Sequence, residues 1–304
     1  SAASDVYKRQ ALGKSRIVTQ FCEGTFKTGL FPMQPMDVKR FSLLTGHRDC
    51  VYALEEIPKL PVFFSGSGDG MIVQWDMGQT EGEQIARMDA SVYALCYPPG
   101  GGLLLAGHNY EGLHALDWQA RKEVASLKLT TAAIFDIRIY EGMVLVACGD
   151  GTVSVVDLAK WALHTRIIGG EKSARSIAVN PVAGEIAVGY SDNFIRIFRA
   201  GDYSLKAEFP AHDSSVFTVQ YSPDMKWLFS GSRDARLKVW NVEENYRLRQ
   251  EIVAHMYAIN DIRFSPDGKH FVTCSMDKSV KVWRTTDLTL LKVIDKARHA
   301  GHGT

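Results

Sequence analysis

The sequence has little cysteine, and no two of its cysteines are spaced as a metal-binding or redox pair. The five cysteines are dispersed along the chain and none belongs to a Cys-x-x-Cys motif: Cys22, Cys50, Cys96, Cys148 and Cys274. This spacing excludes a disulfide framework and a zinc knuckle. The sequence also lacks an Asn-x-Ser/Thr acceptor for N-glycosylation. Both absences favour an intracellular protein, and we predict a cytoplasmic location.

An excess of charge of one sign is also missing. The 304 residues include 35 Lys and Arg against 34 Asp and Glu, a formal net charge of +1. A chain so balanced has no global basic field to attract nucleic acid or an anionic membrane surface. No window approaches the roughly 18 consecutive apolar residues of a membrane-spanning helix. We therefore expect no membrane partner and disfavour nucleic acid.

What the sequence does contain is a set of four residue types that recurs at fixed offsets. From each of three histidines the chain runs 18 residues to a hydroxyl, 22 to an Asp and 28 to a Trp. The three tetrads are His47, Ser65, Asp69 and Trp75; His212, Ser230, Asp234 and Trp240; and His255, Thr273, Asp277 and Trp283. Such gapless recurrence indicates an internal structural repeat.

Weaker copies of the repeat fill the space between the first two tetrads. Repeat starts at residues 47, 88, 128, 170, 212 and 255 are separated by 40 to 43 residues. Within a unit, segments such as 236–240 and 279–283 alternate polar and apolar residues, which is typical of strands. The sequence therefore predicts about four short strands for each repeat and no long helix.

The repeat resembles that of the WD40 family, which builds β-propellers. The resemblance covers residues 38–304 and is carried by Gly46-His47, the Asp six residues before each Trp, and Trp75-Asp76. It implies an all-β WD40 propeller. Because Gly301-His302 looks like one more repeat start, we predict a seven-bladed type with six complete repeats and a C-terminally truncated seventh blade.

The two ends of the chain fit the repeat less well. Residues 38–44 are predicted to form an outer strand donated to the last blade. Residues 1–37 are predicted to be a leader outside the repeat. Residues 1–10 have the character of a non-native adapter. Residues 11–37 either form an improvised hairpin or have no stable structure.

The combination of Ser, His and Asp also suggests a hydrolase triad, and this alternative must be weighed. A triad activates one nucleophile at one exposed site, whereas this set occurs three times and always with a Trp. The family resemblance implies a structural network in which Asp bonds His, His bonds the hydroxyl, and the hydroxyl bonds the Trp indole. We therefore predict no catalytic residue, no metal site and no cofactor.

Without a catalytic site, we predict a non-catalytic scaffold for protein or peptide partners. The resemblance implies that contacts come from loop residues just after each His position or just before each hairpin Asp. These are Arg48, Asp89, Asn109, Thr131, Glu171, Asp213, Arg233, Met256 and Met276. Two alternatives stay open: a ribonucleoprotein or nucleic-acid assembly factor, and a propeller that binds a small molecule in its central channel.

Overall fold

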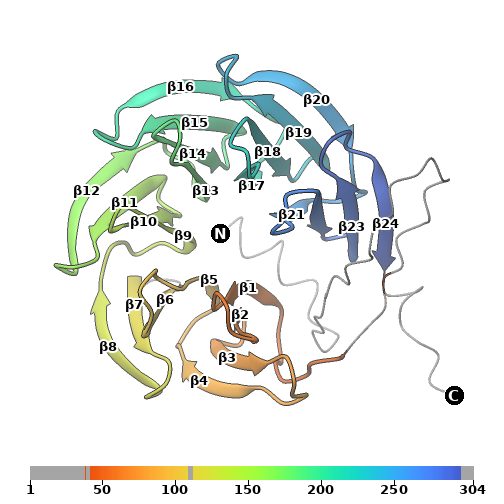
Figure 1. Cartoon of the computed structure of the whole chain (residues 1–304). Coiled ribbons are helices and arrows are strands. Elements are labelled where there is room, and N and C mark those ends of the chain that lie inside the picture. Colours follow the sequence, from red (N-terminus) through yellow and green to blue (C-terminus); the bar gives the residue numbers. More distant parts are fainter. Residues whose placement is uncertain (1–37, 39–41, 109–111, 296–304) are drawn as a thin grey trace, which may run out of the picture. The chain divides into compact units, whose positions relative to one another are not determined.

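A computed structural model of the chain describes residue 38 and residues 42–108 and 112–295. These residues form 24 strands joined by turns, arranged as six four-stranded antiparallel sheets, which we call blades 1 to 6. The all-β prediction is confirmed, as are four strands per repeat. In this part of the chain no helix is long and apolar enough to span a bilayer. The described residues fall into two compact units, 42–166 and 167–295, which we treat separately (Figure 1).

Unit 1 holds blades 1 to 3, each formed by four consecutive strands of the chain. Their strands are β1 (Val51–Glu56), β2 (Val62–Ser67), β3 (Met71–Asp76) and β4 (Glu83–Arg87); β5 (Val92–Cys96), β6 (Leu103–His108), β7 (Gly112–Asp117) and β8 (Lys122–Leu127); and β9 (Ile134–Tyr140), β10 (Met143–Cys148), β11 (Thr152–Asp157) and β12 (Ala162–Ile168). β12 carries the chain into the second unit.

Unit 2 holds blades 4 to 6 with the same strand order. Their strands are β13 (Ala174–Asn180), β14 (Glu185–Tyr190), β15 (Phe194–Arg199) and β16 (Leu205–Pro210); β17 (Val216–Tyr221), β18 (Trp227–Ser232), β19 (Arg236–Asn241) and β20 (Arg247–Val253); and β21 (Ile259–Phe264), β22 (His270–Ser275), β23 (Ser279–Arg284) and β24 (Leu290–Asp295).

The hydrophobic core of each unit lies between neighbouring blades. In unit 1, Phe64 of blade 1 packs in one cluster with Val92 and Leu104 of blade 2. In unit 2, Ile195 of blade 4 packs in one cluster with Val219 of blade 5. Burying each such side chain stabilises the fold by about 1.5–3 kcal/mol. A blade therefore depends on its neighbour for its core, as expected for a repeat that cannot bury its faces alone.

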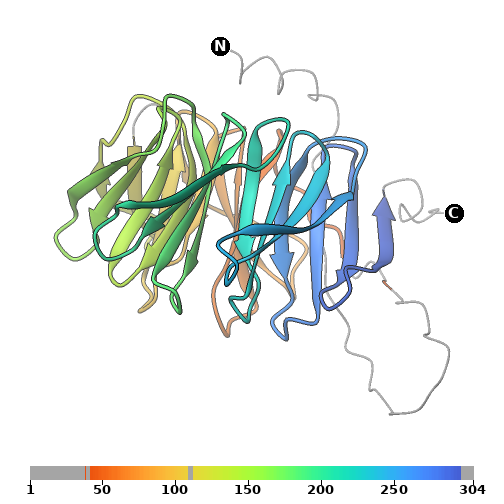
Figure 2. The same ribbon diagram turned by 90° about the horizontal axis from the view of Figure 1, so that it is seen from above.

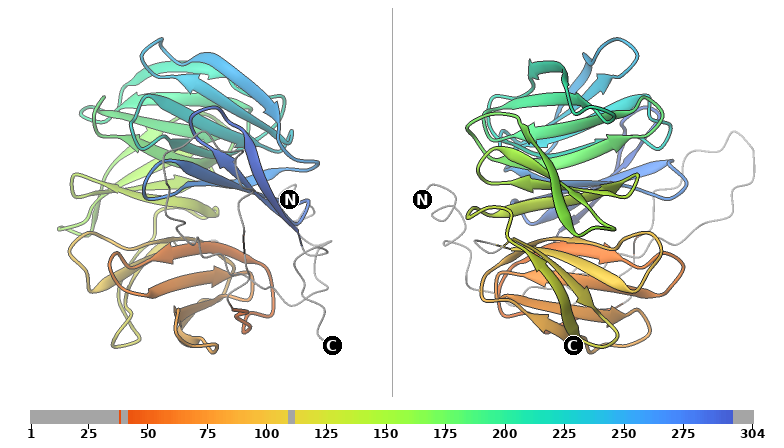
Figure 3. Two further views of the ribbon diagram at one scale, coloured as in Figure 1. Left: turned by 45° about the vertical axis from the view of Figure 1, so that its right-hand side comes forward. Right: turned by 90° about the vertical axis from the view of Figure 1, so that its left-hand side faces the viewer.

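Within each unit the blades fan apart from their first strands to their fourth. The first strands of neighbouring blades contact one another, β1 with β5 and β5 with β9 in unit 1, and β13 with β17 and β17 with β21 in unit 2. The antiparallel order puts the loop that leads into the first strand and the turn between the second and third strands at the same end of each blade. We call these the leading loop and the 2–3 turn (Figures 2 and 3).

The fourth strand of every blade is a sheet edge with exposed side chains. In β20, Arg247 and Arg249 are exposed, and in β8 so are Lys122 and Glu123. Each edge strand is hydrogen-bonded on one side only within its sheet. Charged side chains on such an edge oppose pairing with a strand of another molecule.

The predicted seventh blade is wrong. The described residues form six sheets, and each takes its four strands from one continuous segment, with β24 completing blade 6. Within residues 42–44 the structure has no strand, and Leu44 instead packs on Val73 and Trp75 of blade 1. The prediction rested on a two-residue match at Gly301-His302, which, like residues 1–37 and 39–41, lies outside the described residues. A match so short has no strand pattern behind it.

Candidate functional site

The three predicted tetrads are each brought together at one end of their blade. In blade 5, Nδ1 of His212 lies 2.9 Å from a carboxylate oxygen of Asp234, and Nε2 lies 2.8 Å from Oγ of Ser230. Nε1 of Trp240 donates to the same Oγ at 2.9 Å. Blade 1 repeats this with His47, Asp69, Ser65 and Trp75, and blade 6 with His255, Asp277, Thr273 and Trp283.

Hydrogen-bond chemistry gives each tetrad one direction. The indole N–H can only donate, so the hydroxyl accepts from it and donates its own proton to Nε2 of the histidine. Nδ1–H of the histidine then donates to the carboxylate. The hydroxyl oxygens belong to buried residues, with Ser65 at 2% exposure and Ser230 and Thr273 at 0%. A hydroxyl that is enclosed and already engaged by an indole cannot approach a substrate, so the geometry favours a structural network over a nucleophile.

The environment of blade 5 shifts the pKa values of the tetrad in a way that keeps the histidine neutral. Burial lowers the pKa of His212 below its ordinary value of 6.5, although the neighbouring Asp234 opposes the shift. Burial alone would raise the pKa of Asp234, but hydrogen bonds from His212 and from the amides of Arg236 and Asp213 outweigh it and lower the pKa to about 2. The pair is thus a neutral imidazole that donates to a carboxylate.

Each tetrad also fixes the leading loop against the 2–3 turn. The backbone amides of Arg48, Asp213 and Met256 donate to the tetrad carboxylates at 2.7, 3.0 and 3.2 Å. These three are among the residues that the sequence nominates for partner contacts. Their side chains are exposed, and that of Met256 is 84% exposed. The tetrad therefore holds the backbone while the side chains beside it face solvent.

The other nominated contact residues have similar places in their blades. Asp89, Thr131, Glu171 and Arg233 are exposed in leading loops or 2–3 turns, and Met276 is half-buried in the turn of blade 6. Asn109 lies outside the described residues. Sequence reasoning missed Tyr257, which follows Met256 and is 62% exposed. A comparison of repeat positions alone could not distinguish it from the neighbouring apolar residues of the strand.

The blades without the tetrad use other side chains at the same end. In blade 3, Oγ1 of Thr130 donates to the hairpin carboxylate of Asp150 at 2.7 Å. In blade 2, Nε2 of His108 lies 2.9 Å from Nε2 of His114, whose Nδ1 lies 3.2 Å from Glu123. Sequence reasoning did not find either network because the residue types change with the repeat.

Blade 4 replaces the tetrad with an arginine. The guanidinium of Arg196 lies over the rings of Tyr190 and Phe194, at 4.7 and 5.3 Å from their centroids. It also pairs with Asp192 at 2.8 Å and with Glu208 at 3.1 Å. The hairpin Asp thus keeps its position in this blade while its partner changes from imidazole to guanidinium.

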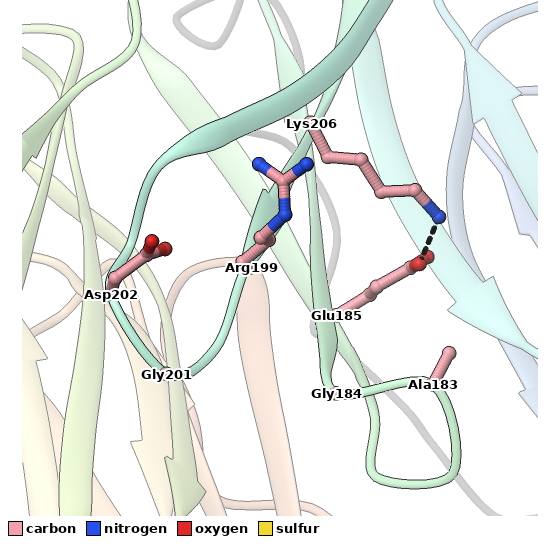
Figure 4. A pocket seen from close by; sticks show the side chains of 7 residues that line it. All are labelled: Ala183, Gly184, Glu185, Arg199, Gly201, Asp202 and Lys206. Carbon is pink, nitrogen blue, oxygen red and sulfur yellow. Dashed lines mark hydrogen bonds and ion pairs between the residues drawn. The ribbon is translucent and has the colours of Figure 1, made fainter.

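A shallow depression of about 460 Å³ lies at the opposite end of blade 4, between the turns at 181–184 and 200–204 (Figure 4). Lys206 and Tyr246 bond the two oxygens of Glu185. Arg199 donates to Oγ of Ser204 at 3.0 Å, and Asp202 accepts from the amide of the same serine at 2.9 Å. Because its charged groups bond one another and the protein itself, we assign no ligand to this depression.

The described residues also gather no three His, Cys, Asp or Glu side chains in an arrangement suited to a metal ion. Burial raises the pKa of the thiols of Cys96 and Cys274 to about 12, which disfavours the thiolate that nucleophilic or ligating cysteines need. The tetrads and the loops beside them are thus the features from which a function can be argued.

Comparison with known proteins adds a family and distant relatives. The family model described as "WD domain, G-beta repeat" matches residues 38–76, 203–241 and 246–284, the three segments that carry the complete tetrads. Each matched segment begins ahead of the leading loop and ends at the third strand of its blade. The sequence repeat is therefore offset from the structural blade, whose fourth strand follows the match.

The relatives are similar at low identity. Actin-interacting protein 1 of Drosophila melanogaster is 25% identical over 217 residues, which is 68% of this chain and 34% of that protein. Protein groucho of the same organism is 24% identical over 184 residues, 57% of this chain and 25% of that protein. WD repeat and HMG-box DNA-binding protein 1 of Mus musculus is 24% identical over 110 residues, 36% of this chain and 10% of that protein. The matches thus span about a third or less of these relatives.

Proposed function

Because the chain belongs to the WD40-repeat β-propeller family, we propose that it is a non-catalytic scaffold that presents its leading loops and 2–3 turns to protein or peptide partners. A cytoplasmic location is part of this proposal. The observation that carries it is the fixing of exposed loop residues by buried tetrads, seen at Arg48, Asp213 and Met256. A loop held in this way loses little conformational entropy when a partner binds, which favours affinity.

The chemistry of these loops suits a mixed peptide. Unit 1 offers Arg48, Asp89 and Thr131, and unit 2 offers Glu171, Asp213 and Arg233 beside the exposed Met256. Methionine adapts its shape to apolar partners, and arginine recognises carboxylates. We therefore expect partners whose contact segments combine acidic and apolar residues.

The similarity to known proteins supports an interaction role in general terms. The name of Actin-interacting protein 1 states that this relative interacts with another protein, and its match covers 68% of the present chain. Which partner the present chain takes does not follow from that name. The mouse relative is named for DNA binding together with an HMG box, and its match covers 36% of this chain.

Affinity capture from cell extract with charge-reversed variants tests the proposal. The variant carries Arg48→Glu and Arg233→Glu in the leading loop of blade 1 and the 2–3 turn of blade 5. The matched control carries Lys160→Glu and Lys269→Glu, two exposed lysines in turns at the opposite end of their blades. We expect the first variant to lose part of the captured set identified by mass spectrometry, and the control to retain it.

An unchanged partner set in the loop variant would remove this surface from consideration. Equal losses in both variants would point to a general charge effect instead. Retention of the chain on RNA or DNA at about 0.15 M salt would favour the nucleic-acid alternative. A ligand-dependent rise in melting temperature across a metabolite panel would favour a small-molecule binder.

A further inference from the structure

Three aromatic side chains form a row along unit 1. Tyr52, Tyr93 and Phe135 are each the second residue of the first strand of their blade, in β1, β5 and β9. The ring centroids of Tyr52 and Tyr93 are 4.7 Å apart, and those of Tyr93 and Phe135 are 5.7 Å apart. All three side chains are half-buried, so part of each remains open to solvent. The row lies at the end of the blades that carries the leading loops.

The backbone is built to present these rings. In each of the three strands the register with the second strand skips this residue, for example from Val51 to Ala53 in blade 1. The ring-bearing residue is thus the extra residue of a β-bulge. A bulge turns the side chain of its extra residue out of the normal alternation of the strand. Three bulges at one position in neighbouring blades align three rings.

A carboxylate lies beside the row. A Cβ built on Gly68 would lie 2.7 Å from Oδ2 of Asp49 and 3.1 Å from Cε2 of Tyr52, so the carboxylate and the ring meet over this glycine. Asp136 adjoins Phe135 and pairs with Arg138 at 3.4 Å, and the exposed Asp89 lies in the leading loop of blade 2. The exposed Arg48 is the main opposing charge among the neighbouring loop residues. The carboxylates outnumber the free cations, which suits a positively charged guest.

Unit 2 contains an example of the chemistry that this register position accommodates. Its equivalent residues are Arg175 of β13 and Phe217 of β17, which also sit in β-bulges. The guanidinium of Arg175 lies over the ring of Phe217, 4.8 Å from its centroid. Here the chain places its own arginine on an aromatic ring at this position. Guanidinium over an aromatic face is a favourable cation–π contact.

Building on the proposed scaffold function, we propose that the row of Tyr52, Tyr93 and Phe135 is the subsite that receives an arginine side chain of a peptide partner. The guanidinium stacks on the central ring of Tyr93 and pairs with the carboxylate of Asp49. A nucleic acid would also find rings to stack on. Its phosphates, however, would face Asp49, Asp89 and Asp136, so the charge favours a peptide.

Fluorescence anisotropy with the full chain tests the subsite. The probe is a fluorescein-labelled Gly-Ser peptide that carries two arginines, compared with the same peptide carrying citrulline, which keeps the shape of arginine without its charge. We expect the arginine peptide to bind and the citrulline peptide to bind at least about tenfold more weakly. Tyr93→Leu should weaken arginine-peptide binding about five- to tenfold, because leucine keeps apolar packing but removes the ring.

Matched variants separate the subsite from general damage. Tyr93→Phe keeps the ring and should bind within about twofold of the wild type, and Phe217→Leu alters the ring in unit 2 that Arg175 covers and should also bind normally. Asp49→Asn should weaken binding about two- to threefold at low salt. If Tyr93→Leu fails to fold, the citrulline comparison and Asp49→Asn still decide the question on folded protein.

Several outcomes would overturn the proposal. Equal affinity for the arginine and citrulline peptides would do so, as would wild-type binding by a folded Tyr93→Leu variant. Binding of a labelled oligouridine in preference to the arginine peptide at 0.15 M salt, lost in Tyr93→Leu, would replace the peptide with nucleic acid. If the arginine peptide fails while capture of cellular partners still depends on Arg48 and Arg233, only the arginine subsite falls and the scaffold function stands.

Discussion

At the scale of single residues, the hydroxyl oxygen is the centre of each tetrad. Oγ of Ser230 accepts the proton of the Trp240 indole and donates to Nε2 of His212. One buried oxygen thus satisfies two buried partners. Removing it leaves both an imidazole nitrogen and an indole N–H without a hydrogen bond in an enclosed site, and each such group costs about 1–3 kcal/mol.

We predict that Ser230→Ala lowers the free energy of unfolding by about 2–4 kcal/mol, since two groups lose their partner. Urea unfolding followed by tryptophan fluorescence measures the change. Ser230→Thr is the matched control, because blade 6 has Thr273 at this position with the same two contacts. Equal stability of the alanine and threonine variants would contradict the direction and importance assigned to this hydroxyl.

The tetrads could be found from sequence because a hydrogen-bond network requires particular residue types at fixed offsets. The networks of blades 2 to 4 could not be found in this way. His114 of blade 2 and Arg196 of blade 4 come from third strands and bond partners that have no counterpart in the tetrad. A sequence pattern identifies a recurring solution, whereas each of these blades reaches its own.

At the scale of structural elements, the 2–3 turn needs a left-handed residue directly after the hairpin Asp. Gly70, Ala235 and Lys278 have φ values of +77°, +67° and +67° at this position, and Asn193 has +76°. The left-handed conformation costs a residue with a Cβ about 1–2 kcal/mol. Blade 1 meets the requirement with glycine, while blades 5 and 6 accept the strain.

We predict that Gly70→Ala lowers the melting temperature much more than its size suggests, with a loss of at least about 2 kcal/mol in stability. The added Cβ would overlap the carbonyl oxygen of Met88 in addition to the strain of the positive φ. Ala235→Gly, at the same position of blade 5, should instead be neutral or gain up to about 1 kcal/mol. Differential scanning calorimetry of both variants checks the pair, and a stability loss in Ala235→Gly equal to that in Gly70→Ala would refute the explanation.

The β-bulges are the element that sequence reasoning could not supply. Tyr52, Tyr93 and Phe135 lie in strand patterns that read as apolar on both faces, so they were indistinguishable from core residues. The skipped register that exposes them depends on how the first and second strands pair, for example at Val92 and Ala94. Strand pairing is a tertiary property, and alternation within one strand does not encode it.

At the scale of the whole molecule, the number of blades shows how far repeat counting can be trusted. Six starts with spacings of 40 to 43 residues carried strand patterns of their own, and each became a four-stranded sheet. The seventh start had only Gly301-His302 behind it. Periodicity predicts a blade when the strands that fill the period are present, because those strands supply the apolar faces that neighbouring blades bury.

The buried histidines predict how the stability of the molecule depends on pH. Burial lowers the pKa of both His212 and His255 below the ordinary value of 6.5. The unfolded chain therefore binds protons more readily than the folded one as the pH falls through 6.5. We expect the free energy of unfolding to fall by about 1–2 kcal/mol between pH 7.5 and pH 5.

The carboxylates act in the same direction at lower pH. The pKa of Asp234 is lowered to about 2, so the stability that it contributes is lost below its ordinary value of 3.8. Urea titrations at pH 7.5, 6.5, 5.5 and 5.0 measure the dependence. The double variant His212→Gln with His255→Gln should flatten the curve between pH 7.5 and 5, whatever its absolute stability. A curve that rises on acidification would refute the lowered histidine pKa values.

The sheet edges formed by the fourth strands have a consequence for concentrated solutions. Their unpaired backbone groups could template strand-by-strand growth between molecules, the first step toward fibrillar aggregates. Arg247 and Arg249 of β20 oppose this growth through mutual repulsion when two copies of that edge approach. With a formal net charge of only +1, the molecule has little overall repulsion to keep copies apart, so these local charges act as its gatekeepers against self-association.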